Sequence, residues 1–390
     1  MMSALLEIKD LVTNFYTYEG VVRALNKVSL TVDHGITFGL VGESGCGKSV
    51  TVRSIMRIIQ EPGRIDAGQV FFHPDPQNPD ACVDLLKQSE TFMESLRGDR
   101  ISMIFQEPNA ALNPILSIGE QVSESFLFHR KKEMCEQVYH GMGFQNPLMR
   151  WVYRTAARNP EAPLLKMLNK LPLLKYWSRP LKAEAIRRSV EIIGKLGISN
   201  PEEIVRRYPH NLSGGMKQRI VIAIALACNP ILLIADEATS NLDVTIQAQI
   251  LELLKRLKEK GISSILLITH DLGVVAETCD RVGVMYAGNL CEVAAVKDLF
   301  HRPHHPYSEA LLASVPKFSQ DGQLKSIDGS VPNLVEPPSG CRFHPRCVHA
   351  MEICRKKLPE MVTLRGSHQV ACHLWQAGGE RKNKADQTES

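Results

Sequence analysis

Two adjacent carboxylates, Asp236 and Glu237, follow the short aliphatic run ILLIA, which has the composition of a buried strand. Charges that emerge from an apolar strand at its carboxyl end usually belong to a binding or catalytic site. Consecutive residues at a strand end point in different directions, so the two carboxylates can do separate jobs. The pair is therefore the first candidate for metal binding and acid–base chemistry.

A phosphate-binding loop is predicted at residues 42–49, where GESGCGKS fits the pattern G-x-x-x-x-G-K-S. An apolar strand, ITFGLV, precedes the loop and a helix with apolar periodicity follows it, which is the context that a P-loop requires. Glycines let backbone N–H groups turn toward phosphates, Lys48 supplies positive charge, and the Ser49 hydroxyl can ligate Mg²⁺. The predicted nucleotide contacts of this segment are Gly42, Ser44, Gly45, Cys46, Gly47, Lys48, Ser49 and Thr51.

A second phosphate contact is predicted at LSGG, residues 212–215, a turn of small residues before the apolar helix IVIAIALA. Backbone amides and the positive end of a helix dipole attract a phosphate. Ser213, Gly214 and Gly215 are therefore further candidates for nucleotide binding.

The segments LSGGMKQR, ILLIADE and SNLD occur in this order at close spacing and resemble the signature, Walker B and D-loop motifs of the ATP-binding subunits of ABC transporters. The resemblance implies an α/β fold: a RecA-like P-loop ATPase core with an antiparallel β subdomain, an enlarged α-helical subdomain and a small cysteine-containing C-terminal extension. It implies ATP and Mg²⁺ as cofactors, with Asp236 as a Mg²⁺ ligand and Glu237 as the base that polarises water. Asp243 is expected at the nucleotide interface between two subunits. Ala238 and Ser240 differ from the residues usual in these family motifs, but neither difference removes a catalytic group.

The resemblance implies three further site positions. Gln106 lies where the family has a glutamine that contacts the metal and the water, so we assign it both a catalytic and a metal-binding role. His270 follows Walker B at the distance of the switch histidine, which hydrogen-bonds the γ-phosphate. Phe15 or Tyr16 stands where the family has an aromatic residue stacked on adenine; Phe15 is favoured, and a core aromatic of the sheet is the alternative for either.

Size and composition are those of an ordinary water-exposed globular protein, at 390 residues, 44% hydrophobic and 23% charged. The net charge of +4 is too small to argue for nucleic acid. The sequence shows no secretory signal and no apolar run near the ~20 residues of a spanning helix. We predict an ATP-binding domain over 1–300, with its helical subdomain at about 107–212, and an extension over 301–390.

Residues 127–182 depart from the family pattern by some tens of extra residues. From 131 to 182 there are ten Lys or Arg and three Glu, together with Trp151 and Trp177. One interpretation is a segment that lies on an anionic membrane surface. The other is an enlarged helical subdomain with a basic face, built from several short helices because of Pro160, Pro163, Pro172 and Pro180.

Four cysteines lie close together near the C-terminus, with the spacing C-x₅-C-x₆-C-x₁₇-C: Cys341, Cys347, Cys354 and Cys372. Four thiolates can hold tetrahedral zinc or an iron–sulfur cluster, and free thiols are a third alternative. His344, His349 and His373 are nearby substitute ligands for zinc. Because peptide-importer ATPases with this terminal pattern are linked to a [4Fe–4S] cluster, the resemblance favours that cofactor over Zn²⁺.

YPH-x-LSGGM, the ALNP that follows Gln106 and the segment HRPHHPYSEALLASVP (301–316) are similar to the oligopeptide and dipeptide importer branch, which includes nickel importers. The resemblance implies an ATPase subunit at the cytoplasmic face of the membrane. Its partners would be two permeases, a second ATP-binding subunit (a paralogue is favoured, and a second copy of this chain is the alternative) and an extracytoplasmic solute-binding protein, with no nucleic acid.

Three alternatives remain open. The first is the same importer class with nickel chelates or oligosaccharides as solute. The second is an ABC ATPase that acts on ribosomes or nucleic acid, although such proteins generally carry two cassettes and this chain has one P-loop and one LSGG. The third is a redox regulator that couples the cysteines to ATP hydrolysis.

Overall fold

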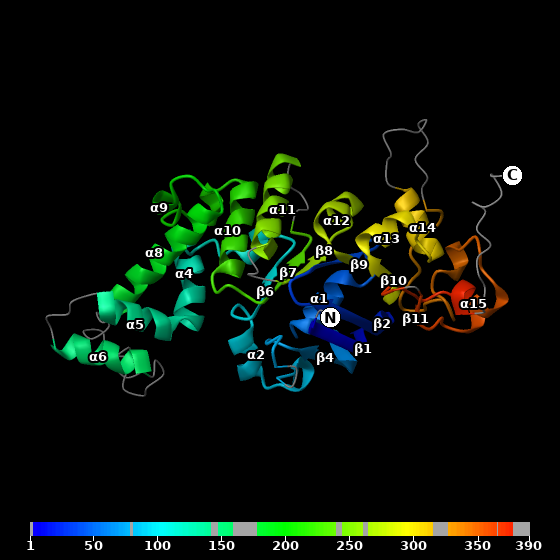
Figure 1. Ribbon diagram of the computed structural model, residues 1–390, viewed down its shortest axis with the longest axis horizontal. Coiled ribbons are helices and arrows are strands. Elements are labelled where there is room, and N and C mark those ends of the chain that lie inside the picture. Colours follow the sequence, from blue (N-terminus) through cyan, green and yellow to red (C-terminus); the bar gives the residue numbers. More distant parts are fainter. Residues whose placement is uncertain are drawn as a thin grey trace. The chain divides into compact units, whose positions relative to one another are not determined.

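The computed structural model describes residues 3–78, 81–141, 147–158, 178–238, 244–259, 264–314, 327–364 and 366–376. The chain forms two compact units (Figure 1). The first comprises the described parts of 1–93, 234–237 and 264–390, and the second those of 94–233 and 238–263. Within these described ranges, no helix is both long and apolar enough to cross a membrane.

The first unit contains a four-stranded antiparallel sheet in the order β2-β1-β4-β5. Its strands are β1 (Ala4–Thr17), β2 (Gly20–Asp33), β4 (Gly63–Phe72) and β5 (Val83–Asp84). Apolar residues alternate along β2, where Val28, Leu30 and Val32 are all buried on one face. η1 (Leu85–Lys87) and α2 (Glu90–Leu96) follow β5 in the chain.

A second sheet supplies the edge on which the P-loop and the carboxylates stand. Its central strands β3 (Thr37–Val41), β7 (Leu232–Asp236) and β8 (Ser264–Ile268) are buried along their whole length. β3 pairs in parallel with β8 and with β9 (Arg281–Tyr286). Because parallel neighbours end at the same edge, the residues that follow β3, β7 and β8 meet there. α1 (Lys48–Ile55) follows β3, and α12 (Leu272–Thr278) follows β8.

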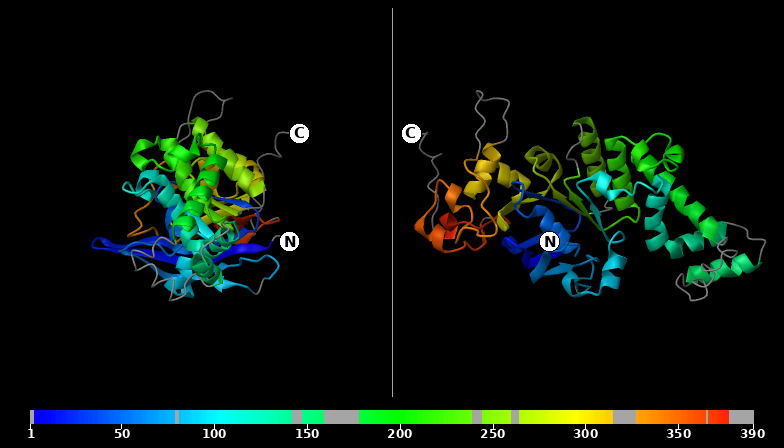
Figure 2. Two further views of the ribbon diagram at one scale, coloured as in Figure 1. Left: turned by 90° about the vertical axis from the view of Figure 1, so that its left-hand side faces the viewer. Right: turned by 180° about the vertical axis from the view of Figure 1, so that it is seen from behind.

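The C-terminal extension joins this sheet instead of standing apart from it. β10 (Asn289–Ala295) pairs antiparallel with β9 on one side and with β12 (Gln369–Val370) on the other, and β12 pairs with β11 (Val362–Thr363). The right-hand view of Figure 2 shows the orange extension beside the yellow helices that precede it. Tyr307 and Phe343 are buried in the shared core. The helical elements here are α13 (Val296–His301), α14 (Pro306–Ala313), η4 (His344–Arg346), α15 (Glu352–Lys356) and α16 (His373–Gln376).

The second unit is mainly helical. Its elements are β6 (Ile101–Ile104), α3 (Pro108–Ala111), α4 (Ile118–His129), α5 (Lys131–Gly141), α6 (Pro147–Arg158), α8 (Arg179–Lys195), α9 (Pro201–Ile204), η3 (Pro209–Asn211), α10 (Gly214–Leu226) and α11 (Val244–Glu259). α10 is the helix expected after LSGG. α4 begins with a capping box in which the side chains and backbone of Ser117 and Glu120 satisfy each other.

The basic segment 127–182 contributes the short helices α5 and α6 to this unit. Pro160, Pro163 and Pro172, on which the prediction of short helices partly rests, lie outside the described residues. α5 packs between α6 and α8 (Figure 1), and its Met134, Cys135 and Val138 are buried. Arg188 of α8 donates to Glu133 of α5 at 2.8 Å. The described part of the segment therefore shares a core with α8. Trp177 lies outside the described residues, and Trp151 is half exposed on α6.

Candidate functional site

The P-loop closes around the side chain of Lys48, the first residue of α1. Gly42 (φ 149°) and Gly47 (φ 106°) take conformations that side chains disfavour, and a Cβ on Gly47 would lie 2.9 Å from the carbonyl oxygen of Ala24. Lys48 is 5% exposed, and its Nζ donates to the carbonyl oxygens of Gly42 (2.8 Å) and Glu43 (3.1 Å). The loop therefore holds a cation inside a ring of backbone groups, as a phosphate site requires.

Ser49 and Asp236 meet across the sheet edge, although 187 positions separate them in the sequence. The Ser49 hydroxyl donates to Asp236 Oδ1 at 2.8 Å. Burial raises the pKa of the Asp236 carboxyl, and the Ser49 hydrogen bond opposes that rise. A hydroxyl and a carboxylate oxygen are ligands that Mg²⁺ prefers, so these two residues fit the predicted metal.

The backbone of Glu237, directly after β7, departs from the strand conformation. Its φ is 48°, in the left-handed region that side-chain-bearing residues rarely adopt, and such strain gathers at functional sites. The Glu237 N–H donates to the carbonyl of Ile268 at the end of β8, and Glu237 Oε1 lies 3.6 Å from His270 Nδ1. The structure thus brings the predicted base and the predicted switch histidine together.

The predicted adenine-stacking residues and Gln106 are described by the structure, whereas one further predicted residue is not. Tyr16 is about half exposed and its hydroxyl donates to Asp66 at 2.9 Å, whereas Phe15, its neighbour on β1, is partly buried. Gln106 is exposed just after β6, which ends at Ile104. Asp243 lies outside the described residues.

The signature turn has the predicted geometry. Ser213 is the N-cap of α10, and its hydroxyl accepts the N–H of Met216 at 3.4 Å. Gly214 and Gly215 form the first turn of that helix. Gln218, to which the sequence reasoning gave no role, is buried and donates to the carbonyl of Ala238 at 2.6 Å. Its position in LSGG-x-x-Q-R was the signal that could have marked it.

The four C-terminal cysteines lie in one region of the first unit. Cys354 and Cys372 are buried, and Cys341 and Cys347 are half-buried. Burial raises the pKa of Cys372 to about 12, and the charges of Cys341, Cys347 and Cys354 raise it further. The Cys341 N–H donates to the carbonyl oxygen of Cys354 at 2.8 Å. Cys354 Sγ also accepts the N–H of Met351 at 3.4 Å.

The four cysteines, all among the described residues, do not form a group that could hold a metal ion. Within the described ranges, no group of three or more His, Cys, Asp or Glu side chains is placed to hold a single metal ion. Two of the three predicted substitute ligands face carbonyl oxygens: His344 Nδ1 lies 2.9 Å from that of Cys341, and His373 Nε2 2.8 Å from that of Lys357. The predicted [4Fe–4S] cluster and its zinc alternative are therefore not established by the structure.

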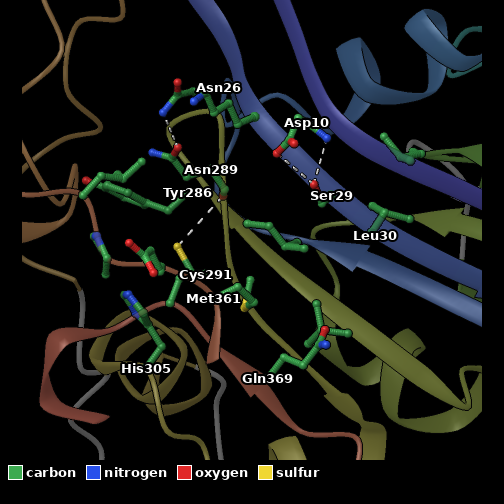
Figure 3. Close-up of a pocket in the computed structure, with 18 of the residues that line it drawn as sticks. Asp10, Asn26, Ser29, Leu30, Tyr286, Asn289, Cys291, His305, Met361 and Gln369 are labelled. Atoms are coloured by element: carbon green, nitrogen blue, oxygen red, sulfur yellow. Dashed lines mark hydrogen bonds between the residues drawn. The ribbon is translucent and has the colours of Figure 1, made fainter. Parts of the chain in front are cut away.

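A cavity of about 690 Å³ lies where the extension meets the N-terminal hairpin (Figure 3). Asn26 donates to Asn289 at 2.8 Å at one side, and Cys291 and His305 line another part. None of residues 42–49 lines it. The cavity is therefore separate from the predicted nucleotide site.

Comparison with known proteins decides the family. Residues 25–240 match the family described as ABC transporter, and residues 291–354 match the oligopeptide/dipeptide transporter C-terminal region. The chain belongs to the ATP-binding subunits of ABC transporters. The predicted resemblance is thereby confirmed, and the chain is an ABC-type ATPase whose family hydrolyses ATP to drive transport.

Similarity to curated ABC subunits extends over nearly the whole chain. The oligopeptide transport ATP-binding protein AppD of Bacillus subtilis is 42% identical over 380 residues, 97% of this chain and 99% of that protein. The dipeptide transport ATP-binding protein DppD of the same organism is 41% identical, over 96% of this chain and 95% of that protein.

Solved ABC structures confirm the predicted fold class. A dimeric ATP-binding cassette bound to ADP and phosphate aligns with a TM-score of 0.54, covering 75% of this chain and 99% of that chain at 22% identity. A cassette of a cbiONQ transporter from Clostridium perfringens aligns with a TM-score of 0.51.

Proposed function

We propose that this chain is the ATP-hydrolysing subunit that energises import of oligopeptides or dipeptides by an ABC transporter. The observation that carries the substrate class is similarity to peptide-transport subunits over both the ATPase core and the extension. The same chain has one P-loop and one LSGG, which argues against the two-cassette proteins that act on ribosomes or nucleic acid.

The site geometry supports a division of roles around ATP. Lys48 and the P-loop amides bind the phosphates, while Ser49 and Asp236 hold Mg²⁺, which neutralises phosphate charge when bound. Glu237 orients and deprotonates the attacking water, and His270, 3.6 Å away, keeps it aligned.

Three further groups complete the proposed site. Gln106 contacts the metal and the water, and Phe15 or Tyr16 stacks on adenine. The signature residues Ser213, Gly214 and Gly215, with Asp243, act across the interface on the nucleotide of a second ATP-binding subunit.

The proposed setting is the cytoplasmic face of the membrane, in complex with two permeases, a second ATPase and, through them, a solute-binding protein. Affinity purification of the chain from gently solubilised native membranes, followed by mass spectrometry, tests this. We expect two permeases and a second ATPase, with a binding protein that identifies the solute, whether peptide, nickel chelate or oligosaccharide. Recovery only with ribosomes or nucleic acid would contradict the proposal.

The four C-terminal cysteines, we propose, hold a [4Fe–4S] cluster. The support for the cluster over zinc is the resemblance of the terminal cysteine pattern to that of peptide-importer ATPases. The N–H donated to Cys354 Sγ is a contact of the kind that stabilises a cluster thiolate.

Anaerobic purification and measurement of iron and acid-labile sulfide test the cluster. We expect about four of each per chain in the wild type and loss of both in Cys347→Ser, whereas Cys82→Ser, at an exposed cysteine outside the group, should keep them. Stoichiometric zinc without sulfide would assign the site to a structural metal instead.

A further inference from the structure

Arg346, in the C-terminal extension, forms a two-pronged ion pair with Glu43 of the P-loop. Arg346 Nη1 lies 2.7 Å from Glu43 Oε2, and Nη2 lies 3.1 Å from Oε1. The Arg346 side chain is 5% exposed and that of Glu43 is 26% exposed, so the arginine side of the pair is sheltered from water. A bidentate guanidinium–carboxylate contact also fixes the relative orientation of the two groups.

The remaining donors of Arg346 lock the guanidinium in place. Nε donates to the carbonyl of Asp328 at 2.8 Å, Nη2 to that of Ile327 at 3.2 Å, and Nη1 to the Tyr286 hydroxyl at 3.3 Å. With the two bonds to Glu43, these contacts match the five N–H donors that an arginine carries. Arg346 therefore cannot turn away from Glu43 without losing several hydrogen bonds.

The extension also holds the backbone of Glu43. The Glu43 N–H donates to the hydroxyl of Tyr307 at 2.9 Å, and Tyr307 is fully buried against Tyr286 and Phe343. On its other side, the Glu43 carbonyl accepts from Lys48 Nζ at 3.1 Å. A single P-loop residue is thus fixed by two side chains of the extension while it positions the lysine that is to meet the phosphates.

Charge gives this contact a consequence for nucleotide binding. Glu43 is the one acidic residue of the segment GESGCGKS, and an uncompensated carboxylate there repels the phosphates of ATP. The guanidinium of Arg346 compensates that charge and holds the carboxylate to one side. We propose that Arg346 is a positioning residue of the nucleotide site, through which the cysteine-containing extension sets the geometry and charge of the P-loop.

The test measures ATP affinity and steady-state ATP hydrolysis for the wild type, Arg346→Ala, Arg346→Lys, Glu43→Gln and the double variant Glu43→Gln/Arg346→Ala. Arg355→Ala, at an exposed arginine of the same extension, is the matched control. We expect Arg346→Ala to weaken ATP binding about tenfold, with a larger change in KM than in kcat. Arg346→Lys should give an intermediate loss of ATP affinity, because lysine keeps the positive charge but lacks the planar guanidinium that bonds both carboxylate oxygens.

The double variant distinguishes an Arg346 that positions the P-loop through Glu43 from an Arg346 that only stabilises the fold of the extension. Removing the Glu43 carboxylate should restore ATP affinity to within about threefold of the wild type, whereas an arginine that only packs the extension gives no such recovery. Glu43→Gln alone should bind ATP at least as tightly as the wild type. This single variant tests the proposal if Arg346→Ala does not fold. Unchanged affinity in Arg346→Ala, absence of recovery in the double variant, or weaker binding in Glu43→Gln would overturn the proposal. The inference about Arg346 rests on the proposed binding of ATP by the P-loop. A wild-type protein that binds no ATP would refute the proposed ATPase function instead.

Discussion

At the scale of single residues, the site is shaped by where backbone conformation sends each side chain. Asp236 is the last residue of β7, is buried, and accepts a hydrogen bond from the Ser49 hydroxyl. The left-handed backbone conformation of Glu237 directs the next carboxylate toward His270. Two adjacent acids thereby reach different surroundings, one buried beside the P-loop and one beside an imidazole that is 60% exposed. Adjacent positions in the sequence can therefore take the two proposed roles, metal binding at Asp236 and base catalysis at Glu237.

Replacing Lys48 with alanine should weaken nucleotide binding itself. The ammonium is enclosed by the loop, and its removal takes away the positive charge that meets the phosphates. We expect at least a tenfold rise in the Kd for ATP, about 1.4 kcal/mol, by equilibrium binding of a fluorescent nucleotide. Lys87→Ala, at an exposed lysine of the same unit, is the control, and unchanged affinity in Lys48→Ala would refute the assigned role.

At the scale of elements, the start of α14 contains a pH-sensitive cap. His305 is 2% exposed, and its Nδ1 accepts the N–H of Tyr307 at 3.0 Å. Burial lowers the pKa of His305 to about 4, partly offset by the charge of Glu292. Because the unfolded chain protonates this imidazole near pH 6.5, it binds more protons than the folded chain between about pH 6.5 and 4. The free energy of unfolding should therefore fall over that window as pH drops, by about 3 kcal/mol.

Replacing His305 with asparagine should remove this share of the pH dependence while keeping a capping side chain. The measurement is the thermal unfolding midpoint across pH 7 to 4, followed by circular dichroism. His301→Asn, at an exposed histidine of α13, should retain the wild-type slope. An unchanged slope in His305→Asn would show that another group carries the effect.

The neighbouring Glu292 extends the acid response to lower pH. Burial opposes its ionisation, but hydrogen bonds from His368 and from the N–H groups of His304 and His305 outweigh burial and lower the pKa of its carboxyl. Its contribution is therefore present above its unfolded pKa of about 4.5 and is lost as pH falls through the folded value. The His305 window lies above this one, so the two effects separate in a pH titration.

Deleting residues 131–181 tests whether the basic segment is an insertion. The deletion removes α5, α6 and the start of α8 (179–181), and it exposes the face of α8 that α5 covers, so we expect a lower unfolding temperature of the helical unit. ATP binding at the P-loop, which belongs to the other unit, should persist. Calorimetry and nucleotide binding measure the two effects, and a chain that no longer folds would show that the segment is core.

At the scale of the whole molecule, hydrolysis is expected to require a second ATP-binding subunit, because the family resemblance implies that each nucleotide contacts the signature turn of the other chain. Glu237→Gln should bind ATP normally, lose turnover by at least a hundredfold and accumulate an ATP-dependent complex with that subunit. Phosphate release and size-exclusion chromatography measure these outcomes. Glu277→Gln, at an exposed acid of α12, is the control, and wild-type turnover in Glu237→Gln would remove it as the base.

Local motifs made much of this protein predictable from its sequence alone. The P-loop, the Asp236–Glu237 pair and the signature turn each depend on residues a few positions apart, so glycine conformations, strand patterns and helix starts identify them. The alternation in β2 and the helix after LSGG follow for the same reason. Such features are encoded by short-range periodicity, which survives in any fold that buries the apolar face.

Only the tertiary structure decided how the C-terminal extension meets the ATPase core. The contacts of Glu43 with Tyr307 and Arg346 join residues 264 and 303 positions apart, and nothing in either segment identifies its partner. The same holds for β12, which extends the sheet beside β10. These features depend on which buried surfaces pack together across the whole chain, a property that no local pattern of residues contains.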